Sequence, residues 1–267
     1  MEKVKTSNLE EPTSVQSLQQ LQKEFKDYIS KAVRSKEYCD LMDPLIEQID
    51  NDRVASINET FLFYGDDRYG YGELAELVAN ILNIEIPKNL YIMTRSEAEK
   101  TNLPADAAGG YDAKTRSIGF VVPDGEHPVT WRIMKATRTV AHEMWHAYQH
   151  NEIDKKKERA RLYQDNFDNY ICASEQQNNE AILACIKQPM ETEAYVFQEK
   201  FTRSFIERLF DSLVKERDKD IGGKAISAAT GFLDDEYWFE TEHEAKMKEL
   251  DRLQKIIGNR ESTKTNK

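Results

Sequence analysis

Residues 139–151 contain a His-Glu-x-x-His motif that restricts both the fold and the chemistry of this chain. The motif residues are His142, Glu143 and His146. On an α-helix the two histidines would share a face, about 6 Å apart along the axis, and two imidazoles held in this way can both bind one Zn²⁺ at about 2.0–2.1 Å. Glu143 would project beside the pair, where its carboxylate can take a proton from a metal-bound water. The motif therefore predicts a helical zinc site with His142 and His146 as ligands and Glu143 as the general base.

The sequence around the motif is typical of a buried helix. Residues 127–130 predict a turn and an N-cap, and Asn151 predicts the helix end. Apolar residues surround much of the expected helix: Trp131, Met134, Val140, Ala141, Met144, Trp145 and Tyr148. A core helix with two ordinary polar histidines would show the same apolar pattern. The pair of histidines four residues apart, with a glutamate between them, favours metal binding over this alternative.

A third histidine, His150, extends the row by one more turn. Three histidines on successive turns spread over about 12 Å, which is too far for them to share one ion. We therefore expect His150 to be a cation near the C-terminus of the helix, where positive charge is favourable.

Composition limits the possible partners and the cellular compartment. The chain has 267 residues, 39% of them hydrophobic, which suffices for one core with helical extensions. The formal net charge of −11 argues against a nucleic-acid partner, because phosphate binding requires a basic surface. No stretch predicts a signal peptide or a membrane span, and Cys39, Cys172 and Cys185 are too few for a disulfide framework. These features predict a cytoplasmic protein with no nucleic-acid and no membrane partner.

The segment before the motif predicts helices followed by a small sheet. Spacing of apolar residues and glycines predicts these elements: helices over 15–35 and 39–57, a loop at Gly70 and Gly72, a helix over 73–82 and a strand over 90–93. Residues 107–122 predict a β-hairpin. Its outer strand either only completes the sheet or also pairs with an extended peptide substrate, and both can hold at once.

The third ligand is expected on a second helix, after one or two helices within residues 154–187. Pro189 is favourable at a helix start, and an apolar seam then continues to about residue 217: Ala194, Phe197, Phe201, Phe205, Leu209 and Leu213. At about 100° per residue, Glu191 lies about 60° from the centre of this seam and Glu193 about 100° away on its other side. Glu191 is therefore the better-placed ligand. Glu193 stays open as the alternative, and both acids are also favoured in a first helical turn by the helix dipole.

The combination of H-E-M-W-H with a later helix that begins E-T-E-A-Y resembles the gluzincin group of zincin metallopeptidases, especially its small minigluzincin members. The resemblance covers roughly residues 88–215. It implies that the glutamate helix packs behind the motif helix, that His142, His146 and Glu191 bind zinc, and that Glu143 is the general base.

The chain departs from this group at Tyr195, where many relatives carry an aspartate or asparagine that supports a histidine ligand. This substitution puts the support of a histidine in question. The other zincin branch has a glycine three residues after the second histidine and a third histidine further on. Gln149 and Glu152 occupy those positions here, which excludes that branch.

We therefore expect an α+β protein with a zincin-like core, in which a small mixed sheet lies with the motif helix and the glutamate helix, and with additional N- and C-terminal helices. The expected division is a helical extension over 1–60, a metallopeptidase domain over 61–217 and an appendage over 218–267. That appendage would contain a helix over 241–257 and a disordered tail, and it either docks on the core or binds a partner.

The expected function is hydrolysis of a peptide or protein substrate with one Zn²⁺ per chain. The alternative is a zinc-binding regulatory or interaction protein on the same scaffold. Tyr111, His127 and Tyr195 are the candidates for a donor to the oxyanion.

Overall fold

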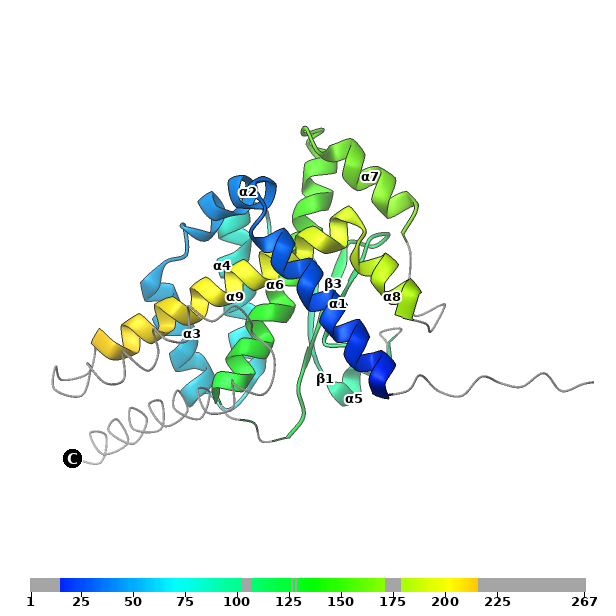
Figure 1. The fold of residues 1–267 in the computed structure, drawn as a ribbon. Helices are drawn as coiled ribbons and strands as arrows, with labels where there is room; N and C mark the ends of the chain where they lie inside the picture. Colours follow the sequence, from blue (N-terminus) through cyan, green and yellow to red (C-terminus); the bar gives the residue numbers. More distant parts are fainter. Residues whose placement is uncertain (1–14, 102–106, 126, 128, 171–178, 216–267) are drawn as a thin grey trace, which may run out of the picture.

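The computed structural model describes residues 15–101, 107–125, 127, 129–170 and 179–215 (Figure 1). The described chain is an α+β structure, mostly helical, with one three-stranded sheet. The helix expected over 241–257 and the tail expected to be disordered lie outside the described residues. In the part of the chain that is described, no helix is both long and apolar enough to cross a membrane.

The sheet consists of β1 (Asn89–Thr94), β2 (Gly109–Asp112) and β3 (Ser117–Val122) in the order β1-β3-β2. β3 is central, and it pairs in parallel with β1 and antiparallel with β2. The predicted strand and hairpin are thus confirmed, and the sheet is mixed as expected. Asp112 shapes the hairpin turn, since its carboxylate accepts hydrogen bonds from the backbone N–H groups of Lys114 and Thr115.

Two long helices form the centre of the molecule, α6 (Val129–Asp154) and α9 (Pro189–Lys215). They pack against each other, and Figure 1 shows α9 (yellow) crossing α6 (green). The predicted seam of α9 is buried as far as its side chains are described: Ala194, Phe197, Phe201, Phe205 and Leu209 all have no exposed surface, and the side chain of Leu213 lies outside the described part. Trp145 of α6 stacks on Phe197 with ring centroids 4.6 Å apart. The sheet and α4 (Asp67–Leu82) pack on other faces of α6.

The N-terminal region contains three helices rather than the expected two. α1 (Val15–Val33) agrees with the prediction, but residues 39–57 are divided between α2 (Lys36–Ile46) and α3 (Asn51–Phe63). The physical reason for the break is Asp50, whose side chain caps α3 by accepting a hydrogen bond from the backbone N–H of Asp52. α3 crosses the expected boundary at residue 60, and its buried apolar side chains belong to the same core cluster as those of α6 and α9.

The loop expected at Gly70 and Gly72 is instead the first part of α4, which begins at Asp67 after an Asp66 cap. The prediction was wrong because close packing, not a turn, requires a glycine here. A Cβ atom at Gly70 would lie 2.3 Å from a ring atom of the buried Phe61 on α3. Gly70 therefore permits the close approach of α3 and α4.

Three shorter helices complete the described structure. α5 (Arg95–Ala98), which was not predicted, begins with a capping box between Thr94 and Glu97. α7 (Ala160–Asp168) and α8 (Asn179–Ile186) lie between α6 and α9, in the segment where one or two helices were expected.

The two glycines of α4 provide a matched test of this packing. Gly70→Ala should lower the free energy of unfolding by about 1–3 kcal/mol, because the added methyl group overlaps a fixed ring. Gly72→Ala should instead raise it by about 0.5–1 kcal/mol, since its Cβ would meet only Ile92, at 3.7 Å. Chemical denaturation of both variants measures the difference. A Gly70→Ala protein at least as stable as the wild type would contradict the described packing.

Candidate metal centre

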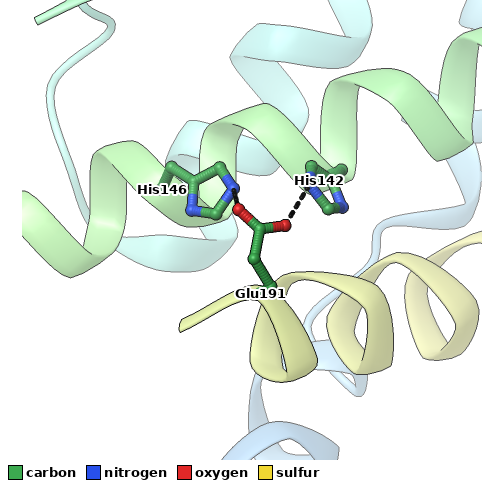
Figure 2. A group of neighbouring side chains, drawn as sticks. All are labelled: His142, His146 and Glu191. Atoms are coloured by element: carbon green, nitrogen blue, oxygen red, sulfur yellow. Dashed lines mark ion pairs between the residues drawn. The ribbon is translucent and has the colours of Figure 1, made fainter. Parts of the chain in front are cut away.

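The packing of α6 on α9 brings together the side chains of His142, His146 and Glu191 (Figure 2). The Nε2 atom of His142 lies 3.4 Å from Oε2 of Glu191, and the Nε2 atom of His146 lies 3.5 Å from Oε1. All three residues offer a ligand atom within 4.8 Å of the others. Two helices far apart in the chain thus bring together the three residues that were predicted to be ligands.

This donor set fits a zinc ion. Two ligand atoms about 2.1 Å from one tetrahedral ion are about 3.4 Å apart. Each histidine Nε2 lies at about this distance from one of the two carboxylate oxygens of Glu191, and the three ligand atoms all lie within 4.8 Å of one another. Two imidazoles and a carboxylate are also a ligand combination of catalytic zinc sites, which leave the fourth position open. His146 and Glu191 are buried and His142 is mostly buried, so water competes little for these atoms.

The electrostatics of the cluster favour an ionised Glu191. Burial opposes this form, but the imidazoles of His146 and His142 outweigh burial and lower the pKa of Glu191 to about 2. Burial lowers the pKa of His146, whereas Glu191 and Glu143 outweigh burial at His142 and raise its pKa. The cluster therefore presents a carboxylate and at least one neutral imidazole, the forms that bind a metal.

Glu143 lies beside the cluster on the side of α6 that faces β2. A Cβ atom at Gly109 of β2 would lie 3.2 Å from Cγ of Glu143 and 2.8 Å from Cγ2 of Thr139. Glycine at this position thus allows the strand to pass close to the carboxylate. Burial raises the pKa of Glu143 to about 7, and the Glu191 carboxylate adds to the shift.

Glu193, the alternative third ligand, points away from the cluster into the protein. Its carboxylate has no exposed surface. It pairs with Arg159 and accepts hydrogen bonds from the Tyr163 hydroxyl, at 2.8 Å, and from the indole of Trp145, at 3.4 Å. Of the two acids of this helical turn, Glu191 alone is placed to bind the same ion as the histidines.

The two histidines have different surroundings at Nδ1. In His146 this atom lies 2.9 Å from Oε1 of Gln149. In His142 it is buried and has no hydrogen-bond partner among the described residues. Tyr195, at the position where many gluzincins carry an acid or amide, packs its ring edge-on against His142 with centroids 4.6 Å apart. The departure noted in the sequence thus leaves His142 with an aromatic neighbour in place of a polar one.

The other histidines and Tyr111 lie outside the cluster. The Tyr111 hydroxyl is 2.7 Å from Nδ1 of His150, and the His150 ring stacks on Phe167. Burial lowers the pKa of His150 to about 4, so the expected cation at the end of the helix is wrong and the ring is neutral at pH 7. His127 stacks on Trp131 and has its Nε2 atom 2.9 Å from a backbone carbonyl.

Sequence reasoning missed Tyr170, which follows α7. Its hydroxyl donates a hydrogen bond to Oε1 of Glu191 over 3.0 Å, and 45% of the residue is exposed. Burial and the Glu191 carboxylate raise the pKa of Tyr170, so the hydroxyl keeps its proton. Neither a motif nor a periodic pattern marks this tyrosine, because only the folding of α7 back toward α9 brings it to the cluster.

Comparison of the chain with protein-family models, with curated proteins and with solved structures found no significant match. The interpretation of the cluster therefore depends on its geometry and chemistry.

Replacement of Glu191 tests the ligand set. Glu191→Gln should reduce zinc affinity by roughly 10-fold to 100-fold or more, because the neutral amide is a far poorer ligand than a carboxylate. Glu207→Gln is the matched control, since Glu207 lies on the same helix and pairs with Arg203 one turn away. Chelator competition measures both affinities. A Glu191→Gln protein that holds zinc as tightly as the wild type would show that the third ligand is a different residue.

Proposed function

We propose that this protein is a single-zinc metallopeptidase of the zincin type, most similar in its ligand set to the gluzincins. The observation that carries the proposal is the convergence of two histidines and a buried glutamate from α9, with Glu143 beside them. Three protein ligands with an adjacent carboxylate are characteristic of hydrolytic zinc sites, because the open position admits water.

The roles of the chain's own groups follow from their positions. Zinc held by these ligands would supply a Lewis acid and lower the pKa of a coordinated water. Glu143 accepts the proton of the attacking water and passes it to the nitrogen of the leaving amine. The Tyr170 hydroxyl donates its one proton to the ligand Glu191 from a half-exposed ring. In the transition state this hydroxyl would turn from Glu191 and donate instead to the oxygen that gains negative charge.

The position of β2 supports an extended peptide as the substrate. Within the described sheet, β2 pairs with β3 on one side only, and Gly109 brings this edge against Glu143. An extended peptide can add to such an edge through main-chain hydrogen bonds. A peptide bound there would present its scissile bond near the general base, which is the arrangement that hydrolysis requires.

The alternative is a protein that binds zinc for structural or regulatory purposes. Structural zinc sites usually have four protein ligands, often cysteines. Within the described residues, the group able to hold a metal has three ligands and contains no cysteine. A buried carboxylate beside a three-ligand site favours catalysis over a structural role.

The Glu143→Gln variant tests the peptidase proposal. It should bind one zinc per chain like the wild type but lose hydrolysis of a peptide library by at least about 10²–10⁴-fold, because the amide cannot accept a proton. Metal analysis and product detection by mass spectrometry measure the two properties together. A wild-type chain that binds zinc without hydrolysing any peptide would favour the regulatory alternative, and a chain without zinc would refute both.

The Tyr170→Phe variant tests the donor to the oxyanion. Removal of the hydroxyl should lower kcat by about 10²–10³-fold with a much smaller change in KM, because the hydrogen bond strengthens in the transition state. Tyr64→Phe is the control, since Tyr64 is 66% exposed on another part of the surface. Equal kinetics of the two variants would assign the donor role to another group.

A further inference from the structure

Gln149 is a fully buried amide one turn after His146 on α6. Its Oε1 atom lies 2.9 Å from Nδ1 of His146. Its Nε2 atom donates to the backbone carbonyl of Met190 over 3.0 Å and to Oε2 of Glu193 over 3.3 Å. The Met190 carbonyl can only accept a hydrogen bond, and a flipped amide would place an oxygen against it. The orientation of the amide is therefore fixed by its surroundings.

The orientation of Gln149 determines the tautomer of His146. An amide oxygen can only accept, so Nδ1 of His146 must carry the proton. A neutral imidazole with its proton on Nδ1 has a free lone pair on Nε2, the atom that faces Glu191. The amide thus holds the ring in the one neutral form that can bind a metal at the cluster.

A second layer of groups holds Gln149 in turn. Besides Gln149, the partners of Glu193 are Arg159, the Tyr163 hydroxyl and the Trp145 indole, and all of them donate. Four donors around one fully buried carboxylate leave it a single arrangement. Met190 and Glu193 flank Glu191 in the first turn of α9, so the turn that supplies the candidate ligand also orients the amide.

We propose that Gln149 is a positioning residue that fixes the tautomer and orientation of His146, and that Glu193, held by Arg159 and Tyr163, fixes Gln149. This inference rests on the proposed zinc site. The polar partner of His146 comes from the motif helix itself, whereas Tyr195 of the second helix packs against His142. The two histidines are consequently unequal, since only His146 has a polar partner at Nδ1 among the described residues.

The Gln149→Met variant tests this proposal with a side chain of similar length that cannot accept the hydrogen bond. Zinc affinity, measured by chelator competition, should fall by roughly 10-fold to 100-fold, as is typical when a partner of a metal-binding histidine is removed. Gln198→Met is the matched control. Gln198 is also a buried glutamine, on α9, and its amide donates to Glu199. Its replacement should change zinc affinity by less than about twofold, within the spread of ordinary distant substitutions.

A spectroscopic measurement separates positioning from a general loss of structure. Nitrogen–proton NMR correlation on the zinc-free protein, above the titration range of histidine, reports which nitrogen of His146 carries the proton. The wild type and Gln198→Met should show the Nδ1–H form, and Gln149→Met should show a shift toward the Nε2–H form. Because this readout needs no metal, it tests the role of Gln149 even if the wild type fails to bind zinc and the proposed function is wrong.

Tyr163→Phe is the second variant, for the case in which Gln149→Met does not fold. It removes one donor from Glu193 and leaves Gln149 in place, so a smaller fall in zinc affinity with a partial change of tautomer is expected. The proposal is overturned if His146 keeps the Nδ1–H form in Gln149→Met. If Gln149→Met does not fold, an unchanged Nδ1–H form in Tyr163→Phe overturns it.

Discussion

The contact between α6 and α9 is the interaction on which the rest of this structure depends. Aromatic side chains of α9 are fully buried in the core cluster that α9 shares with α6, and each such residue stabilises the fold by about 1.5–3 kcal/mol. Ala194 has no exposed surface one turn after Glu191, and its small side chain lets the two helices approach closely. This packing sets the position of Glu191 relative to the two histidines, and in catalytic sites a shift of about 1 Å can cost about 10²-fold in rate.

Three carboxylates are buried along this same contact, and each one has different neighbours. Glu191 faces two imidazoles, and Glu193 is surrounded by donors. For Glu143 the structure gives no hydrogen-bond donor among the described residues, and burial raises its pKa to about 7. A buried carboxyl group with so little compensation is costly for stability and is typical of a functional site. The cost is thus concentrated on the residue to which the motif assigns chemistry.

Local periodicity predicted much of the described fold. The motif helix, the glutamate helix and the β-hairpin all have strong spacing patterns, and the helical wheel distinguished Glu191 from Glu193 before any contact was known. The break between α2 and α3 was missed because the apolar pattern continues across it. Only the Asp50 cap marks the start of the second helix. Gly70 was wrongly predicted to lie in a loop, because the need for a glycine here comes from the nearby ring of Phe61, which lies on another helix.

The groups around the cluster were harder to predict, since their roles depend on contacts between distant segments. Tyr170 and Gln149 have no local signature, and their partners lie on α9. His150 was expected to be charged, but burial under the hairpin and α7, next to Tyr111 and Phe167, keeps it neutral. Sequence spacing identifies side chains that can share a face, whereas burial and protonation follow only from what covers that face.

The placement of the ligands on two helices has a consequence for folding. A zinc ion bound to His146 and Glu191 would be a cross-link that closes the chain segment containing α7 and α8. Such a cross-link restricts the unfolded ensemble more than the folded one, so metal binding and folding become thermodynamically coupled. The melting temperature of this protein would then depend on the concentration of free metal, and metal supply would set how much of the chain is folded.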